Sequence, residues 1–109
     1  VRIGPGSMIS AGVIVNPGSA IGADVILNTG STADHHNRIG DHAHIAPGVH
    51  MGGGVTVDEG VLVGIGATVM PCRRIGAWSV VGAGAVVVRD IPPGLTVIGV
   101  PAKERNPTD

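Results

Sequence analysis

Aliphatic residues recur at every sixth position over most of the chain. Counting from Ile3 in steps of six residues reaches fifteen positions up to Val87, of which fourteen are aliphatic or Met and one is Ala33. The frame holds without insertion from Ile3 to Val86, which is fourteen hexads. Self-similarity at a fixed short period predicts a solenoid, in which each repeat buries its apolar residue against the next one.

The other positions of the hexad carry a turn signal. The fourth position is Gly in nine of the fourteen hexads, and Pro precedes this Gly at Pro5, Pro17 and Pro47. Pro-Gly pairs suit a type II turn, in which Gly supplies the positive φ. Each hexad is therefore predicted to be a very short strand followed by a turn, with one aliphatic side chain pointing inward.

The composition agrees with a narrow and regular core. The 109 residues are 43% hydrophobic, yet they include no Phe, no Tyr and a single Trp, Trp78. An ordinary globular core relies on large rings, whereas strands stacked about 4.8 Å apart need only branched aliphatic and small side chains. Glycine is frequent at 19 residues, but the abundant Val and Ile and a charged fraction of only 14% argue against disorder.

Charge and cysteine content narrow the class of protein further. Seven basic and eight acidic residues give a net charge of −1, so there is no basic excess for nucleic-acid binding. No apolar run is long enough to span a membrane, and no secretory signal is visible. The single cysteine, Cys72, excludes an internal disulfide and fits a reducing compartment. We therefore expect a cytoplasmic protein with neither a nucleic-acid nor a membrane partner.

The hexads resemble those of the hexapeptide-repeat acyltransferases over nearly the whole chain. The resemblance implies an all-β fold, the left-handed parallel β-helix, in which three hexads make one triangular coil of 18 residues. Residues 1–94 would then form about four to five coils, and 95–109 a C-terminal strand and tail. Three columns of inward residues follow: Ile3, Ile21, Ile39, Val57 and Ile75; Ile9, Leu27, Ile45, Val63 and Val81; and Val15, Ala33, Met51, Val69 and Val87.

All five histidines fall between residues 35 and 50, where the frame departs from its own norms. His36 and His42 take fourth positions, where Gly is usual, and Asn37 takes a fifth position that small residues or Val usually hold. Departures from local consistency tend to mark functional sites. An imidazole, with an unperturbed pKa of about 6.5, is suited to accept a proton near neutral pH.

The stretch from Ala33 to Gly48 resembles the sialic-acid and bacillosamine type of sugar acyltransferases. In that family an acid-His-acid stretch precedes Ile-Gly, a second His, an aliphatic residue and a turn Gly. The ending 99–103, Gly-Val-Pro-Ala-Lys, is also similar. The resemblance implies that His35 is the catalytic base, that His44 contacts acetyl-CoA, and that three further residues line the acetyl-CoA groove, namely Gly53, Ile65 and Ala83.

One departure from the family's pattern concerns the partner of the base. The family usually has Asp or Glu directly after the base, and this chain has His36 there. Asp34, on the other side of His35, is the alternative orienting residue. Both are therefore retained as candidates for orienting His35.

The remaining histidines, the cysteine and the tryptophan are expected to have no catalytic role. His42 and His50 are expected to be solvated, Cys72 to fill its turn, and Trp78 to pack on a neighbouring subunit or cap a turn. Five of the seven basic residues lie beyond residue 70. Either these basic residues are exposed to solvent at the edges of the fold, or some of them contact the phosphates of CoA.

The leading functional hypothesis is an acetyl-CoA-dependent acyltransferase, implied by the resemblance. It would move an acetyl group directly to an amino or hydroxyl group of a nucleotide-linked sugar, as a homotrimer, with acetyl-CoA as cosubstrate and no metal. An upstream nucleotide-sugar-binding domain, present in relatives, is expected to be absent from this chain. Two alternatives stay open: a zinc enzyme similar to the γ-class carbonic anhydrases, and a truncated, non-catalytic trimeric β-helix.

Overall fold

The computed structural model describes residues 1–105, which form seventeen short strands. No helix in this part of the chain is long and apolar enough to cross a membrane. The strands are β1 (Arg2–Ile3), β2 (Met8–Ile9), β3 (Ile14–Val15), β4 (Ala20–Ile21), β5 (Ile26–Leu27), β6 (Thr32–Ala33), β7 (Arg38–Ile39), β8 (His44–Ile45), β9 (His50–Met51), β10 (Thr56–Val57), β11 (Leu62–Val63), β12 (Thr68–Val69), β13 (Arg74–Ile75), β14 (Val80–Val81), β15 (Val86–Val87), β16 (Thr96–Ile98) and β17 (Lys103–Glu104).

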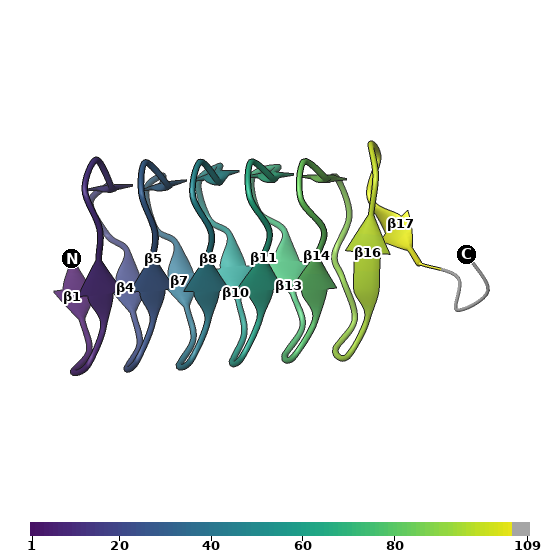
Figure 1. The fold of residues 1–109 in the computed structure, drawn as a ribbon. Coiled ribbons are helices and arrows are strands. Elements are labelled where there is room, and N and C mark those ends of the chain that lie inside the picture. Colours follow the sequence, from purple (N-terminus) through teal and green to yellow (C-terminus); the bar gives the residue numbers. More distant parts are fainter. Residues whose placement is uncertain (106–109) are drawn as a thin grey trace.

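The strands stack into three sheets that form the sides of one column (Figure 1). The first sheet has the order β1-β4-β7-β10-β13, the second β2-β5-β8-β11-β14-β16-β17, and the third β3-β6-β9-β12-β15. Three successive strands make one coil, and the column measures 40 × 22 × 20 Å. The fold is therefore the left-handed parallel β-helix that the family resemblance implies, with about five coils.

The register confirms the predicted coil of 18 residues. Ile21 pairs with Ile3 and Ile39 in the first sheet, and the other two sheets repeat this offset. The three predicted columns are thus formed, and their members are almost fully buried from the second coil onward. Ile3 and Ile9, at the N-terminal end, are 51% and 40% exposed because only one coil contacts them.

Every fourth position of the fourteen hexads has a positive φ, as the turn signal predicts. Nine of these positions are Gly, which adopts this conformation freely. The other five carry a side chain in the left-handed region, where most residues are strained. They are Asp24, His36, His42, Cys72 and Trp78.

The column continues past the boundary expected at residue 94. β16 pairs in parallel with β14, through Val97 and Val81. β17 then pairs antiparallel with β16 and covers that edge of the second sheet. The expected tail is therefore attached to the column up to residue 105, and its residues 106–109 lie outside the described part of the chain.

Candidate active site around His35

The turn that carries Asp34, His35 and His36 joins β6 to β7, at the corner between the third and first sheets. Asn37, which is fully buried beneath this turn, fixes its shape. The Asn37 amide donates to the carbonyl of Asp34 (2.8 Å), and its Oδ1 accepts from the N–H of Val55 (2.7 Å). The N–H of Asn37 donates to Ser19 Oγ (3.0 Å). Asn37 therefore ties together three coils and satisfies all its buried polar groups.

The imidazole of His35 is exposed and lies against Gly53, which follows it by one coil. A Cβ atom at residue 53 would be 2.6 Å from both Cε1 and Nε2 of His35, and 3.1 Å from Nδ1. Real Cβ atoms do not come this close to a ring, so the imidazole occupies space that only glycine leaves open. The Cε1–Nε2 edge of His35 is the part of the ring nearest to Gly53.

His36 is exposed and lies on the opposite side of the turn, against Gly18 of the preceding coil. A Cβ atom at residue 18 would be 2.6 Å from Cδ2 and Nε2 of His36. His36 adopts φ 57°. Its Nδ1 is 3.2 Å from Nδ1 of His35, and the two rings meet edge to face at 77°, with centroids 5.4 Å apart. The two imidazoles therefore form a hydrogen-bonded pair.

Asp34 contacts the main chain of His35 and not its ring. Oδ1 of Asp34 accepts from the N–H of His35 (2.8 Å) and from Nδ2 of Asn16 (2.9 Å). The hydrogen bond from the His35 main chain, followed by the one from Asn16, holds the pKa of Asp34 below its usual value. Of the two candidates for orienting His35, only His36 reaches the imidazole.

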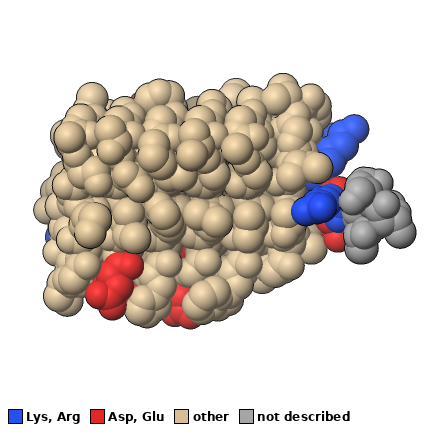
Figure 2. Space-filling view, viewed as in Figure 1, with Lys and Arg blue, Asp and Glu red and all other residues tan. Residues whose placement is uncertain are grey.

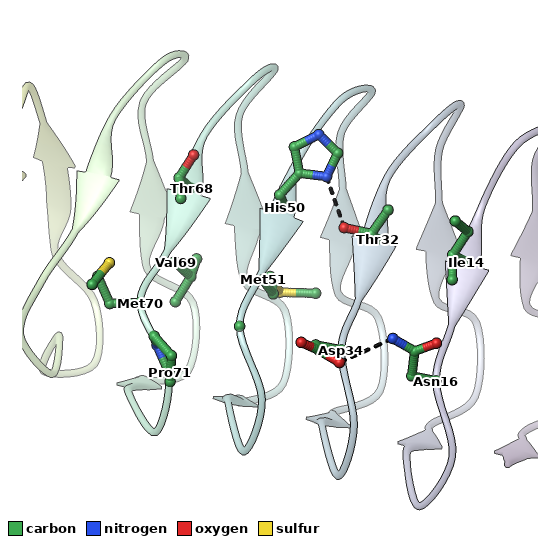
Figure 3. Close-up of a pocket in the computed structure, with 11 residues that line it drawn as sticks. Ile14, Asn16, Thr32, Asp34, His50, Met51, Thr68, Val69, Met70 and Pro71 are labelled. Atoms are coloured by element: carbon green, nitrogen blue, oxygen red, sulfur yellow. Dashed lines mark hydrogen bonds between the residues drawn. The ribbon is translucent and has the colours of Figure 1, made fainter.

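A groove of about 470 Å³ runs along the outer face of the third sheet beside Asp34 (Figure 3). Two hydrogen-bonded pairs cross it: Asn16 with Asp34, and Thr32 Oγ1 with Nδ1 of His50 at 2.7 Å. Amide, hydroxyl and carboxylate groups thus line the face next to the His35 turn. The lining residues are Ile14, Asn16, Thr32, Asp34, His50, Met51, Gly52, Thr68, Val69, Met70 and Pro71.

His44 lies elsewhere in the same chain. It opens β8 in the second sheet, between Ile26 of β5 and Leu62 of β11. Its Nε2 is buried and has no hydrogen-bond partner within residues 1–105. The second sheet is the side of the column opposite the corner that carries His35. One chain therefore does not bring the two histidines together.

The residues expected to line the acetyl-CoA groove divide in the same way. Ile65 and Ala83 lie in turns at the corner between the second and third sheets, one coil apart, and both are exposed. The N–H of Gly84 donates to the carbonyl of Ile65 (2.8 Å). Gly53 belongs instead to the corner of His35. We call His35, His36 and Gly53 the His35 surface, and His44, Ile65 and Ala83 the His44 surface.

Basic side chains gather at one end of the visible face. In the view of Figure 2, Lys and Arg cluster at the C-terminal end beside acidic side chains, and further acidic side chains lie along the lower edge toward the N-terminal end. Arg74, among the basic residues beyond position 70, is engaged within the chain, since its Nε and Nη2 donate to Asp58 at 3.0 and 3.2 Å. This ion pair raises the pKa of Arg74.

The zinc-enzyme alternative requires several His, Cys, Asp or Glu side chains close enough together to bind one metal ion. Among residues 1–105, no three His, Cys, Asp or Glu side chains come together in a way that could hold a metal ion. His42 instead faces Asp24, with Nδ1 and Oδ2 3.8 Å apart, and His50 bonds to Thr32. Residues 1–105 of a single chain therefore provide no zinc-binding site for this alternative.

The structure adds two residues that the motif does not include. Asn16 holds Asp34, and Gly18 makes room for His36. Both lie 18 residues before the residue they contact. The coil length would have identified them, because it makes residues i and i+18 neighbours.

Comparison with solved structures identifies the group of proteins to which this chain is similar. The acetyltransferase domain of PglB from Neisseria gonorrhoeae is 36% identical over 95% of this chain and 54% of that chain, with a TM-score of 0.87; it is also known with acetyl coenzyme A. PerB from Caulobacter crescentus, in complex with CoA and GDP-perosamine, is 39% identical over 96% of this chain and 58% of that one, with a TM-score of 0.75. WeeI from Acinetobacter baumannii is 30% identical, with a TM-score of 0.76.

The chain is a hexapeptide-repeat β-helix that is 30–39% identical to these proteins over 95–96% of its own length. It spans 54–58% of the length of PglB's acetyltransferase domain and of PerB. No family model matches the sequence.

Proposed function

We propose that this hexapeptide-repeat protein transfers an acetyl group from acetyl-CoA to an amino group of a nucleotide-linked sugar. The observation that carries the proposal is the exposed imidazole of His35, which packs over Gly53 at a turn and meets Nδ1 of His36 through its own Nδ1. The similarity to PglB's acetyltransferase domain and to PerB supports the donor and the class of acceptor. In the perosamine N-acetyltransferase, structures with Asn or Ala in place of one histidine were solved with CoA and GDP-perosamine.

In the proposed reaction, His35 acts as a general base. The acceptor amine attacks the thioester carbonyl carbon, a C–N bond forms, and Nε2 of His35 takes the proton that the amine loses. The C–S bond then breaks and CoA leaves as a thiol after protonation. Because the acetyl group passes directly to the amine, no nucleophilic side chain of the protein is needed. A sugar hydroxyl is the alternative nucleophile for the same geometry.

His44 is proposed to contact acetyl-CoA, because its buried Nε2 has no partner within residues 1–105. A buried polar group without a partner is costly, and a ligand oxygen would supply one. Ile65 and Ala83 extend the same side of the column as an open, apolar track. Basic residues at the C-terminal end are proposed to meet the phosphates of CoA. A reducing, acetyl-CoA-containing compartment, the cytoplasm, fits this use.

The division into two surfaces is our reason for proposing a homotrimer. Acetyl-CoA needs both the base and the donor contacts, and one chain presents them on opposite sides of the column. Cyclic symmetry would place the His35 surface of each subunit against the His44 surface of its neighbour. The outward row of the second sheet supports a contact here, because Leu62, beside His44, is 38% exposed and Met8, two strands away in the same row, is 59% exposed.

The proposal is tested by acetyl transfer to GDP-perosamine, measured as CoA thiol release, with His35→Ala and the matched control His50→Ala. His35→Ala should lower kcat about 10²- to 10⁴-fold, the usual worth of general-base assistance. Acetyl-CoA binding, measured by calorimetry, should be nearly unchanged. Wild-type rates in His35→Ala, or no heat with acetyl-CoA in the wild-type chain, would refute the proposal. His50→Ala should keep the wild-type rate, because the side chain of His50 projects from β9 and, among residues 1–105, hydrogen-bonds to Thr32 and not to the His35 turn.

A further inference from the structure

We propose that His36 is the positioning residue of His35, holding its imidazole in the tautomer whose Nε2 is free to accept a proton. The inference rests on the acetyl-transfer function proposed above. It starts from the 3.2 Å contact between the two Nδ1 atoms. A neutral imidazole has one N–H donor and one acceptor nitrogen, so one Nδ1 of the pair donates and the other accepts.

The direction of this hydrogen bond follows from the proposed role of His35. As a base, His35 must keep one ring nitrogen unprotonated, and Nδ1 is the nitrogen that contacts His36, so Nε2 is the one left to accept a proton. Nδ1 of His35 must then carry the proton and donate it to Nδ1 of His36. His36 keeps its own proton on Nε2, beside Gly18. A partner on one ring nitrogen sets which tautomer the histidine adopts.

The alternative partner, the Asp34 carboxylate, has no hydrogen bond to the imidazole of His35 among residues 1–105. Its Oδ1 accepts from the main chain of His35 and from Asn16. Asp34 therefore shapes the turn that carries the base, and the imidazole is left to His36.

The backbone of His36 explains how its ring reaches His35. His36 adopts φ 57° at the fourth position of its hexad, a conformation that four other non-glycine turns of the column share. Here the left-handed conformation directs the ring of His36 over Gly18 while its Nδ1 stays within reach of His35.

A histidine differs from a carboxylate as a partner in one measurable way. A neutral imidazole orients His35 but adds no negative charge to stabilise the imidazolium that forms during the reaction. Asp34 and His36 are the titratable neighbours of His35 on its own turn, and Pro17–Gly18 and Gly53–Gly54 of the adjacent coils add none. A carboxylate at position 36 should therefore move the acidic limb of the pH–rate profile to higher pH, by about one unit or more.

Three substitutions separate these effects. His36→Ala removes the acceptor; His36→Asn restores an oxygen close to the position of Nδ1; and His36→Asp restores it with a charge. Asn and Asp also tolerate a positive φ. The matched control is His42→Ala, because His42 has the same hexad position, exposure and left-handed conformation (φ 61°) but faces Asp24.

With acetyl-CoA and GDP-perosamine, His36→Ala should lower kcat about 10- to 100-fold with little change in the KM for acetyl-CoA. His36→Asn should recover most of the rate, His36→Asp should recover it with the shifted acidic limb, and His42→Ala should match the wild type. Wild-type kcat in His36→Ala overturns the proposal. A rate in His36→Asn as low as in His36→Ala also overturns it.

A second measurement does not depend on activity. The ¹⁵N chemical shifts of the imidazoles in the full chain report which ring nitrogen carries the proton. The proposal requires the Nδ1–H tautomer at His35 in the wild type and its loss in His36→Ala. An Nε2–H tautomer in the wild type overturns the proposal, whereas the Nδ1–H tautomer in a chain that transfers no acetyl group supports the pairing and refutes the proposed function.

Discussion

The imidazole of His35 lies over the bare Cα atom of Gly53, one coil further along the column. Gly53 does not have a positive φ, unlike Gly54 beside it. Glycine is therefore needed at position 53 for space and not for backbone conformation. This separates the two adjacent glycines, since Gly54 serves the turn and Gly53 serves the histidine.

Gly53→Ala should reduce acetyl transfer with little loss of stability. The new methyl group would lie 2.6 Å from the ring of His35, so the exposed imidazole must rotate away. Moving a solvent-exposed ring costs little folding free energy, but it displaces the proposed base by about 1 Å or more, which can cost about 10²-fold in rate. Urea unfolding and kcat for thiol release measure the two effects.

The control for this prediction is the double variant His35→Ala, Gly53→Ala. Once the ring is absent, the methyl group loses its three nearest contacts, all of them with His35, so the second substitution should change neither kcat nor the urea midpoint. An effect of Gly53→Ala that persists in the double variant would mean that the residue acts through something other than His35. Such coupling between contacting residues is what a double-mutant cycle isolates.

Subunits carrying different substitutions should complement one another if the site lies between chains. His35→Ala and His44→Ala should each be nearly inactive alone. Randomly mixed in equal amounts, they should recover about a quarter of the wild-type activity, because each complete site takes His35 from one subunit and His44 from its neighbour. The measurement is thiol release after the two variants are unfolded and refolded together.

Two outcomes would contradict this arrangement. A mixture no more active than its components would mean that both histidines act from the same chain. A single chain by light scattering at micromolar concentration would remove the neighbour altogether. A mixture of His35→Ala with unsubstituted protein is the matched control. Every subunit of this mixture keeps His44, so its activity should be proportional to the fraction of subunits that keep His35.

The hexad frame allowed the fold to be predicted almost completely, because one position in six must face a narrow core. The three columns and the coil length then follow, and the positive φ of every fourth position follows from the frequent Gly. The C-terminal end was harder to predict. β16 returns to the column after an irregular segment, and Ile91 reaches the first sheet through an isolated bridge to Ile75.

The site could be predicted only in part. The motif indicated His35 and left Asp34 and His36 as equal candidates to orient it, because alternation along a strand does not fix side chains in a turn. The choice depends on the rotamer of His36, which depends in turn on Gly18 in the preceding coil. The separation of His35 from His44 depends on which side of the column each hexad occupies.

Cys72→Gly should stabilise the protein. Cys72 has φ 61° and is exposed, so it is strained without a ring contact such as the one that His36 makes with Gly18. Glycine relieves the strain of a side chain in the left-handed conformation, which stabilises the folded state, but its greater backbone freedom stabilises the unfolded state. The net increase in the free energy of unfolding should be about 1 kcal/mol. Urea unfolding measures it. Cys72→Ser, which keeps the strain, should show no gain; an equal gain in both variants would trace the effect to the thiol.

The hydrogen bonds to Asp34 should make stability depend on pH at the acidic end. They lower the pKa of Asp34 in the folded chain, so the folded state favours the carboxylate more than the unfolded state does. The resulting stabilisation is fully present above the unfolded pKa of about 3.9 and is lost as pH falls through the lower, folded value. Asp34→Asn should therefore be less stable than the wild type by a constant amount from pH 5 to pH 7. Below about pH 4 the difference should shrink, because the wild type alone loses its carboxylate.

Asn16→Ala, which removes one of the two hydrogen bonds, should show a smaller change of the same sign. Urea midpoints at pH 3, 5 and 7 test this, and a gap between wild type and Asp34→Asn that widens toward low pH would contradict it.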